Sequence, residues 1–143
     1  FLGRLPMKNQ WGYKPVGLLE APISDIHTLP PGHNIGYGQT FITTKKTTVA
    51  IVPVGYSHGL GVRRENNCPG LSSLPRFIGS LIKNTLFPKK LYGFYKENRF
   101  PVLGKIGMTH VILDVTGADL HIGDIIQLPV NPIYVDSSIP RRY

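Results

Sequence analysis

One apolar stretch, Thr47-Thr48-Val49-Ala50-Ile51-Val52, decides how this chain is organised. Its β-branched residues and its length predict a buried strand. A tyrosine beside glycine lies on each side of it: Gly36-Tyr37-Gly38 precedes the stretch, and Gly55-Tyr56-Ser57-His58-Gly59 follows it. Because glycine permits tight turns and close backbone approach, we expect both tyrosines at strand ends. They are either half-buried aromatics beside turns or proton donors and acceptors of a site.

The composition indicates one soluble, globular domain. The 143 residues are 41% hydrophobic with a mean hydropathy of −0.03. No run approaches the ~20 apolar residues that a membrane span requires, so we expect no membrane partner. The single cysteine, Cys68, excludes an internal disulfide and a cysteine-built metal cluster. This usage fits a reducing compartment, and we expect a cytoplasmic protein.

Positive charge is concentrated in one part of the chain. The net charge is +8, and residues 61–105 carry nine basic and two acidic residues. Such a block can face a phosphate-bearing ligand, an acidic partner or solvent. Nucleic acid is not the expected partner, because aromatic and basic residues do not alternate on one strand as single-strand binders require.

Short apolar stretches separated by turn residues predict a mainly β fold. Proline and glycine number 13 and 16, and they fall between these stretches. The candidate strands are Pro15–Leu19 continuing into Ala21–Leu29, Asn34–Thr43, Thr47–Val54, Phe100–Leu103, His110–Thr116 and Ile125–Leu128.

One segment has a helical period instead. Between residues 71 and 86, apolar side chains recur at three- and four-residue steps, and Pro75 suits a first helical turn. We therefore expect an amphipathic helix over 72–87, inside a helical insertion over 65–95. It either covers the core or presents Arg76 and Lys83 to a partner groove or a membrane surface.

The remaining polar motifs point to little familiar chemistry. Five histidines, at positions 27, 33, 58, 110 and 121, lie one to a segment without metal-ligand spacing, so we expect no metal site. Ser57-His58 stands beside Tyr56, but no Gly-x-Ser-x-Gly elbow or triad order accompanies it. A serine nucleophile is therefore not supported.

Six short motifs follow one another along the chain. They are Lys14-Pro15-Val16, Gly36-Tyr37-Gly38-Gln39-Thr40, Pro53-Val54-Gly55-Tyr56-Ser57-His58-Gly59, Pro101-Val102-Leu103-Gly104-Lys105-Ile106-Gly107-Met108, Asp114-Val115-Thr116 and Gly123-Asp124-Ile125-Ile126. This succession resembles the C-terminal domain of alanine racemase, a pyridoxal-phosphate enzyme. The motifs stand in the family's order, and the two tyrosines are 19 residues apart, as in the family.

The resemblance implies a β-barrel domain over 13–143, with residues 1–12 as the end of a linker from a preceding (β/α)8 barrel. That barrel would hold most of the pyridoxal 5'-phosphate, and its lysine would carry the cofactor. The family's domain reaches into the barrel of the partner subunit, which implies a homodimer when full-length. The implied substrate is an amino acid, alanine, and the implied role is D-alanine supply for the cell wall. The isolated fragment is expected to be inactive.

The resemblance also assigns roles to individual residues. Tyr37 stands where the family has its catalytic acid/base tyrosine. Tyr56 matches the tyrosine that lines the substrate's path, and Met108 matches the residue whose backbone meets the substrate carboxylate. Tyr134 corresponds to a tyrosine that touches the cofactor phosphate.

Four positions depart from the family pattern. Lys105 replaces an arginine and Thr109 an aspartate, both on the substrate side, and Ser57-His58 replaces Ala-Asp. Lysine keeps the charge of arginine but loses its planar fork. These departures, with a short C-terminal segment, leave a second hypothesis open: an inactive, racemase-like interaction module whose basic helix grips an acidic partner.

Overall fold

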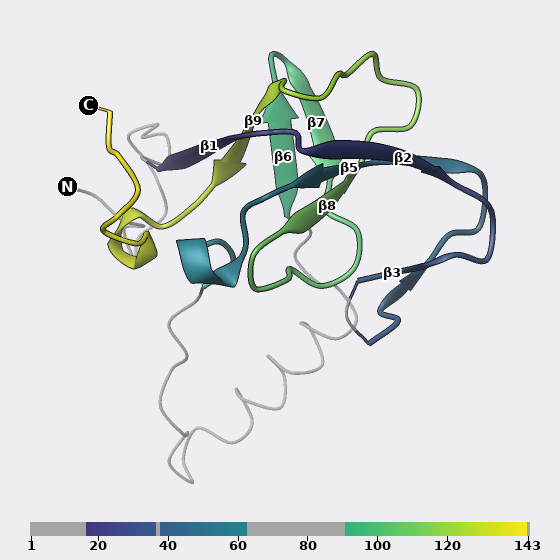
Figure 1. The fold of residues 1–143 in the computed structure, drawn as a ribbon, viewed down its shortest axis with the longest axis horizontal. Helices are drawn as coiled ribbons and strands as arrows, with labels where there is room; N and C mark the ends of the chain where they lie inside the picture. Colours follow the sequence, from purple (N-terminus) through teal and green to yellow (C-terminus); the bar gives the residue numbers. More distant parts are fainter. Residues whose placement is uncertain (1–16, 37, 63–90, 143) are drawn as a thin grey trace, which may run out of the picture.

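The computed structural model describes residues 17–36, 38–62 and 91–142, which form nine strands and two short 3-10 helices in three antiparallel sheets (Figure 1). Tyr37, the expected helix over 72–87 and the expected linker over 1–12 lie outside these ranges. The elements are β1 (Leu18–Pro22), β2 (Asp25–Leu29), β3 (Asn34–Ile35), β4 (Phe41–Ile42), β5 (Thr47–Val52), η1 (Tyr56–His58), β6 (Tyr92–Tyr95), β7 (Asn98–Pro101), β8 (Val111–Asp114), β9 (Ile125–Pro129) and η3 (Pro132–Tyr134).

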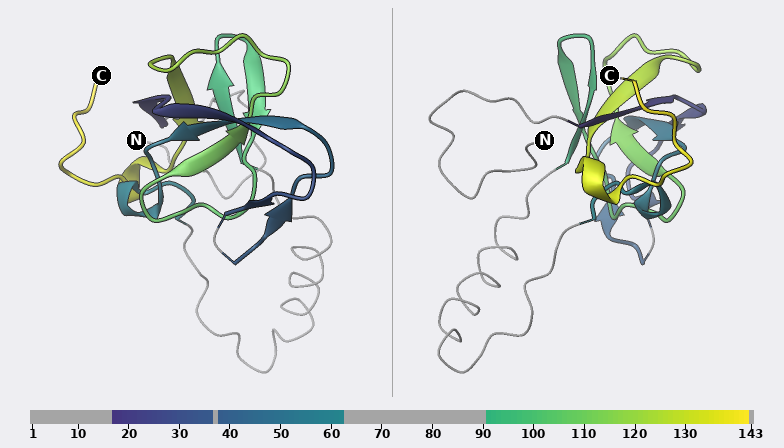
Figure 2. Two further views of the ribbon diagram at one scale, coloured as in Figure 1. Left: turned by 45° about the vertical axis from the view of Figure 1, so that its right-hand side comes forward. Right: turned by 90° about the vertical axis from the view of Figure 1, so that its left-hand side faces the viewer.

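The largest sheet has the strand order β1-β9-β6-β7. Apolar residues alternate with polar or exposed ones along its strands, so Leu19 and Ala21 of β1 and Ile126 and Leu128 of β9 share one buried face. The β6–β7 hairpin stands beside β9 at the top of both views in Figure 2. Gly93 lies on the inward face of this hairpin, where a Cβ would come within 2.9 Å of Leu113 and Ile126.

The second sheet, β2-β5-β8, packs against the first and forms the main core. Its central strand β5 is the apolar stretch Thr47–Val52, buried on both faces as the sequence predicts. One face contributes Ala50, Val52, Val111 and Leu113 to the main core. The other face contributes Val49 to a smaller cluster with Ile35 and Leu103.

That smaller cluster fixes the two-stranded β3–β4 hairpin on the outer face of the second sheet. Ile35 of β3 is buried there, and Phe41 of β4 packs beside it. In the sequence, Tyr37 falls between β3 and β4. The apolar contacts beneath the hairpin therefore determine where its turn lies.

The mainly β class is confirmed, but the three sheets stay open rather than closing into a barrel. Two expected strands are also divided. The segment expected to run from 15 to 29 breaks at Ile23–Ser24, where the chain changes sheet: the Ile23 N–H donates to Asp124 O and the Ser24 N–H to Ile51 O, each at 2.9 Å. The expected strand 34–43 is a hairpin, because Gly36 and Gly38 have φ of +81° and +74°.

The predicted C-terminal boundary of the helical insertion, residue 95, is wrong. Residues 92–95 form strand β6, since Tyr92 and Phe94 suit a sheet and Gly93 pairs with Phe100 of β7. The strand expected at 100–103 accordingly lies at Asn98–Pro101, with Val102 in an isolated bridge to Leu113. No helix within the described ranges is long and apolar enough to cross a membrane.

Candidate functional site

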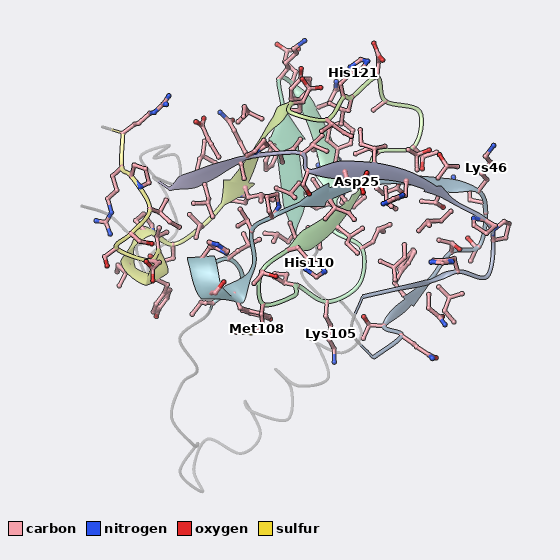
Figure 3. All side chains as sticks on the ribbon, viewed as in Figure 1. Asp25, Lys46, Lys105, Met108, His110 and His121 are labelled. Atoms are coloured by element: carbon pink, nitrogen blue, oxygen red, sulfur yellow. The ribbon has the colours of Figure 1, made fainter. Side chains whose placement is uncertain are left out.

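A single loop, Gly104–His110, contacts both tyrosine-bearing turns. It connects the bridge residue Val102 to β8, and its side chains Lys105, Met108 and His110 line one edge of the molecule in Figure 3. We call it the bracing loop. Its N-terminal half meets the turn of the β3–β4 hairpin, and its C-terminal half meets the turn that contains η1.

The first of these contacts joins the bracing loop to the Tyr37 turn. The Lys105 backbone N–H donates to Thr40 Oγ1 at 3.1 Å. Gly36 and Gly104 face each other so closely that a Cβ on either would lie within 3.5 Å of the other's Cα. Both glycines have positive φ, +81° and +67°, which side chains rarely adopt. Tyr37 itself lies outside the described residues, whereas both of its neighbours are described.

The second contact joins the bracing loop to the Tyr56 turn. The Tyr56 N–H donates to Gly107 O and the Ser57 N–H to Met108 O, each at 3.0 Å. Gly55 is buried against the same carbonyl groups, and a Cβ there would lie 2.2 Å from Gly107 O. Only glycine fits at this position, so the sequence pattern around Tyr56 reflects backbone-to-backbone packing.

Side chains of the Tyr56 turn extend this network. Ser57 Oγ donates to Met108 O at 2.7 Å, and it lies 3.1 Å from His58 Nδ1. The Gly55 N–H donates to His58 Nδ1 at 3.2 Å, while the His58 N–H donates back to Gly55 O at 3.0 Å. The imidazole thus completes a reciprocal cap at the start of η1.

The C-terminal segment packs on the other side of the Tyr56 turn. Gly59 has φ +87°, and a Cβ there would lie 2.3 Å from Tyr134 O. Asp136 follows, and its pKa is lowered by hydrogen bonds from the Ser138 side chain and backbone N–H, with a smaller contribution from His58. Tyr134 is therefore brought to the Tyr56 turn through its backbone.

Several of these side chains are accessible. Met108 is 67% exposed and Tyr56 is 45% exposed. Lys105 and Thr109 are exposed on the same loop. The edge therefore offers a phenol, a thioether and an ammonium group to a ligand or to another domain.

The structure thus brings together the Tyr56 turn and the loop that carries Lys105, Met108 and Thr109, and it places the backbone of Tyr134 beside Gly59 of the Tyr56 turn. Sequence reasoning missed Thr40 and His58 as supports of the two turns. Thr40 belongs to the Gly-Tyr-Gly-x-Thr motif, so its fixed spacing from Tyr37 was an available signal. In residues 17–36, 38–62 and 91–142, no three His, Cys, Asp or Glu side chains gather closely enough to hold a metal ion.

Comparisons with known proteins agree on one family. Residues 16–136 match the family described as alanine racemase, C-terminal domain. The chain is 33% identical over 103 residues to the biosynthetic alanine racemase of Mesorhizobium japonicum, which covers 72% of this chain and 20% of that relative. The first curated relatives are matched over only 20% to 30% of their length, so the chain spans about a quarter of them.

Solved structures give the same result. Alanine racemase of Clostridium difficile 630 matches with a TM-score of 0.57 and 27% identity, over 78% of this chain and 23% of that chain. Alanine racemase of Bartonella henselae, solved with covalently bound pyridoxal phosphate, matches with a TM-score of 0.55 and 23% identity, over 79% of this chain and 25% of that chain.

Proposed function

Because the chain belongs to the family of alanine racemase C-terminal domains, we propose that it is the β domain of an amino-acid racemase acting on alanine. The observation that carries the proposal is the bracing loop. One loop supports the Tyr37 turn through Lys105 and the Tyr56 turn through Gly107 and Met108, so two phenol-bearing turns are held at one edge of the domain. Racemisation needs such an arrangement of a proton-transfer group and a substrate-positioning group.

In this proposal Tyr37 is the acid/base that removes or returns the α-proton of the substrate on one face. Its flanking glycines, Gly36 and Gly38, both have positive φ, a backbone conformation that side chains rarely adopt. A phenol has an ordinary pKa near ~10, so it needs nearby cations to act as a base at neutral pH. The residues that would supply them are expected on the preceding barrel.

Tyr56, Met108, Lys105 and Thr109 line the path to the substrate in this proposal. Tyr56 and Met108 are exposed and hydrogen-bonded through their backbones. Lys105 would attract the substrate carboxylate, and lysine does so as a point charge rather than a bidentate fork. Thr109 contributes a neutral hydroxyl where the family has a carboxylate.

The described residues fit a contributing role toward pyridoxal phosphate rather than a complete cofactor site. All four described lysines, Lys45, Lys46, Lys96 and Lys105, are exposed, whereas an amine that carries the cofactor is usually activated by desolvation. Tyr134 would donate from its hydroxyl to the cofactor phosphate. Bound pyridoxal phosphate supplies an electron sink for the carbanion left after α-proton removal.

We further propose that a barrel domain precedes this chain in the full-length protein, and that the protein is a cytoplasmic homodimer. The chain spans about a quarter of its relatives, which leaves room for that barrel. The exposed edge with Tyr56 and Met108 is then the face directed toward the barrel of the partner subunit.

The test is Tyr37→Phe in the full-length protein, with Tyr92→Phe as the matched control. Tyr92 lies on β6 under the Arg99 guanidinium, and phenylalanine preserves that ring contact. We expect Tyr37→Phe to reduce alanine racemisation by about 10²- to 10⁴-fold while the cofactor absorbance persists. Full activity in Tyr37→Phe would overturn the acid/base role. No racemisation by the wild type would instead favour the interaction-module hypothesis.

A further inference from the structure

His58 occupies an unusual position in the Tyr56 turn, because its ring supports the backbone that carries the tyrosine. Its Nδ1 lies 3.2 Å from Gly55 N and 3.1 Å from Ser57 Oγ. The neighbouring residues Tyr56 and Ser57 are held to the bracing loop by their backbone N–H groups and by Ser57 Oγ, and Gly55 packs against the same loop carbonyls. A change at Nδ1 therefore acts directly on the segment that positions Tyr56.

The hydrogen inventory fixes which proton state this geometry requires. A backbone N–H can only donate, so Nδ1 must accept from Gly55, and the imidazole proton must be on Nε2. Ser57 has one hydroxyl hydrogen, which it donates to Met108 O at 2.7 Å. Its oxygen therefore presents a lone pair toward Nδ1.

Protonation of Nδ1 would change its hydrogen-bond partner from the Gly55 N–H to the Ser57 hydroxyl oxygen. A protonated Nδ1 can donate to the Ser57 lone pair, but it can no longer accept from Gly55. Gly55 is buried, so its N–H would be left without this acceptor, and an unpaired buried donor costs about 1–3 kcal/mol. The two arrangements exclude each other.

We propose that His58 is a positioning residue whose neutral ring holds the Tyr56 turn against the bracing loop, and whose protonation loosens that turn. Histidine side chains ordinarily change charge between about pH 5 and 8, so measurements across that range test the proposal. The consequence for substrate binding rests on the proposed role of Tyr56. The effect on the turn does not depend on that role.

Charged and titratable groups from two neighbouring segments surround the Tyr56 turn. Asp136, from the C-terminal segment, interacts electrostatically with His58. The other titratable groups on the segments packed against the turn are Lys105 and His110 of the bracing loop and Tyr134 beyond Gly59. The direction of the pH effect follows from the bond between the Gly55 N–H and His58 Nδ1, because protonation at low pH removes this hydrogen bond.

The experiment compares the full-length wild type with His58→Asn, His58→Ala and the control His27→Asn. The asparagine Oδ1 can accept from Gly55 at every pH, whereas alanine offers no acceptor. His27 is an exposed residue of β2 that pairs with Asp25 at 2.8 Å. We expect the KM for alanine of the wild type, relative to that of His58→Asn, to rise about five-fold as the pH falls from about 8 to about 5.5.

In the same experiment kcat should show no such relative change, and His58→Ala should have a raised KM at all pH values. The proposal would be overturned if the ratio of the wild-type KM to the His58→Asn KM did not change with pH. Nitrogen NMR of the histidine rings gives a readout independent of turnover: we expect the Nε2–H tautomer of His58 at about pH 8 and a Gly55 amide shift on acidification. An Nδ1–H tautomer would refute the proposal. If the protein has no racemase activity but gives the expected NMR result, the proposal for His58 is supported and the proposed function is rejected.

Discussion

The backbone N–H of Lys105 donates a hydrogen bond to the side-chain oxygen of Thr40 across 3.1 Å, although the two residues are 65 positions apart. This bond ties the bracing loop to the turn that contains Tyr37. The hydroxyl that accepts it stands three residues further along the chain than the proposed acid/base.

Replacement of Thr40 by valine should therefore loosen the Tyr37 turn. Valine preserves the shape of threonine but cannot accept from Lys105, so we expect a loss of about 1 kcal/mol in the free energy of unfolding and a reduced kcat. Thr40→Ser retains the hydroxyl and serves as the matched control. Urea denaturation and racemisation assays measure the two effects. Equal behaviour of the two variants would show that the hydroxyl is not the support.

Gly59 and Gly117 provide a matched pair that separates backbone strain from steric overlap. Both have positive φ, +87° and +80°, but a Cβ at Gly59 would lie 2.3 Å from Tyr134 O, whereas nothing lies within 4 Å of one at Gly117. Gly117→Ala should cost about 1–2 kcal/mol from its left-handed backbone alone. Gly59→Ala should cost about 2 kcal/mol more. Urea midpoints of the two variants test this order, and similar midpoints would contradict the packing of η1 against Tyr134.

Asp124 should make stability depend on pH. Its carboxylate accepts from the His121 N–H at 2.9 Å and from the Tyr95 hydroxyl at 3.0 Å, and its pKa is lowered, first by the His121 hydrogen bond. A lowered folded-state pKa gives stability that is present above the unfolded value and is lost as the pH falls through the folded value.

Asp124→Asn is accordingly expected to lower the urea midpoint at pH 7, with a difference from the wild type that shrinks toward pH 3. Asp119→Asn is the control, because the Asp119 side chain is 98% exposed and lies 3.8 Å from His121 Nε2. A difference that stays constant between the two pH values would rule out the Asp124 carboxylate as the titrating group.

Lys105 tests the proposed path of the substrate. Reversing its charge with Lys105→Glu should raise the KM for alanine by about three- to tenfold, because the substrate carboxylate would meet a like charge. Lys46→Glu makes the same change at an exposed lysine on a different part of the molecule (Figure 3). A similar increase in KM for both variants would indicate a general effect of net charge.

Sequence periodicity predicts most of this fold. The apolar stretch Thr47–Val52 is the central strand of the second sheet, and the alternating pattern near Ile125 identifies β9. Strand β6 was missed because the helical period before it was extended too far, and because the role of Gly93 depends on Leu113 and Ile126 from distant strands. The change of sheet at Ile23–Ser24 likewise leaves no local signal, since both hydrogen-bond partners are remote.

The site was predicted where glycines mark backbone contacts and missed where side chains act as supports. Gly36 and Gly55 follow from their motifs, and the structure gives each a neighbour in the bracing loop. The bond between Thr40 and Lys105 joins residues too far apart for any spacing rule. His58 was considered as a metal ligand and as a partner for a nucleophile, whereas its Nδ1 accepts from the Gly55 backbone.

The bracing loop also has a consequence for how this protein can change over time. Because one loop supports both tyrosine turns, substitutions in either turn share a structural neighbour, and their effects should not be additive. The loop makes these contacts with the backbone of Lys105, Gly107 and Met108, so its side chains can change without removing either support. A substitution that moves the loop backbone would instead displace both turns together.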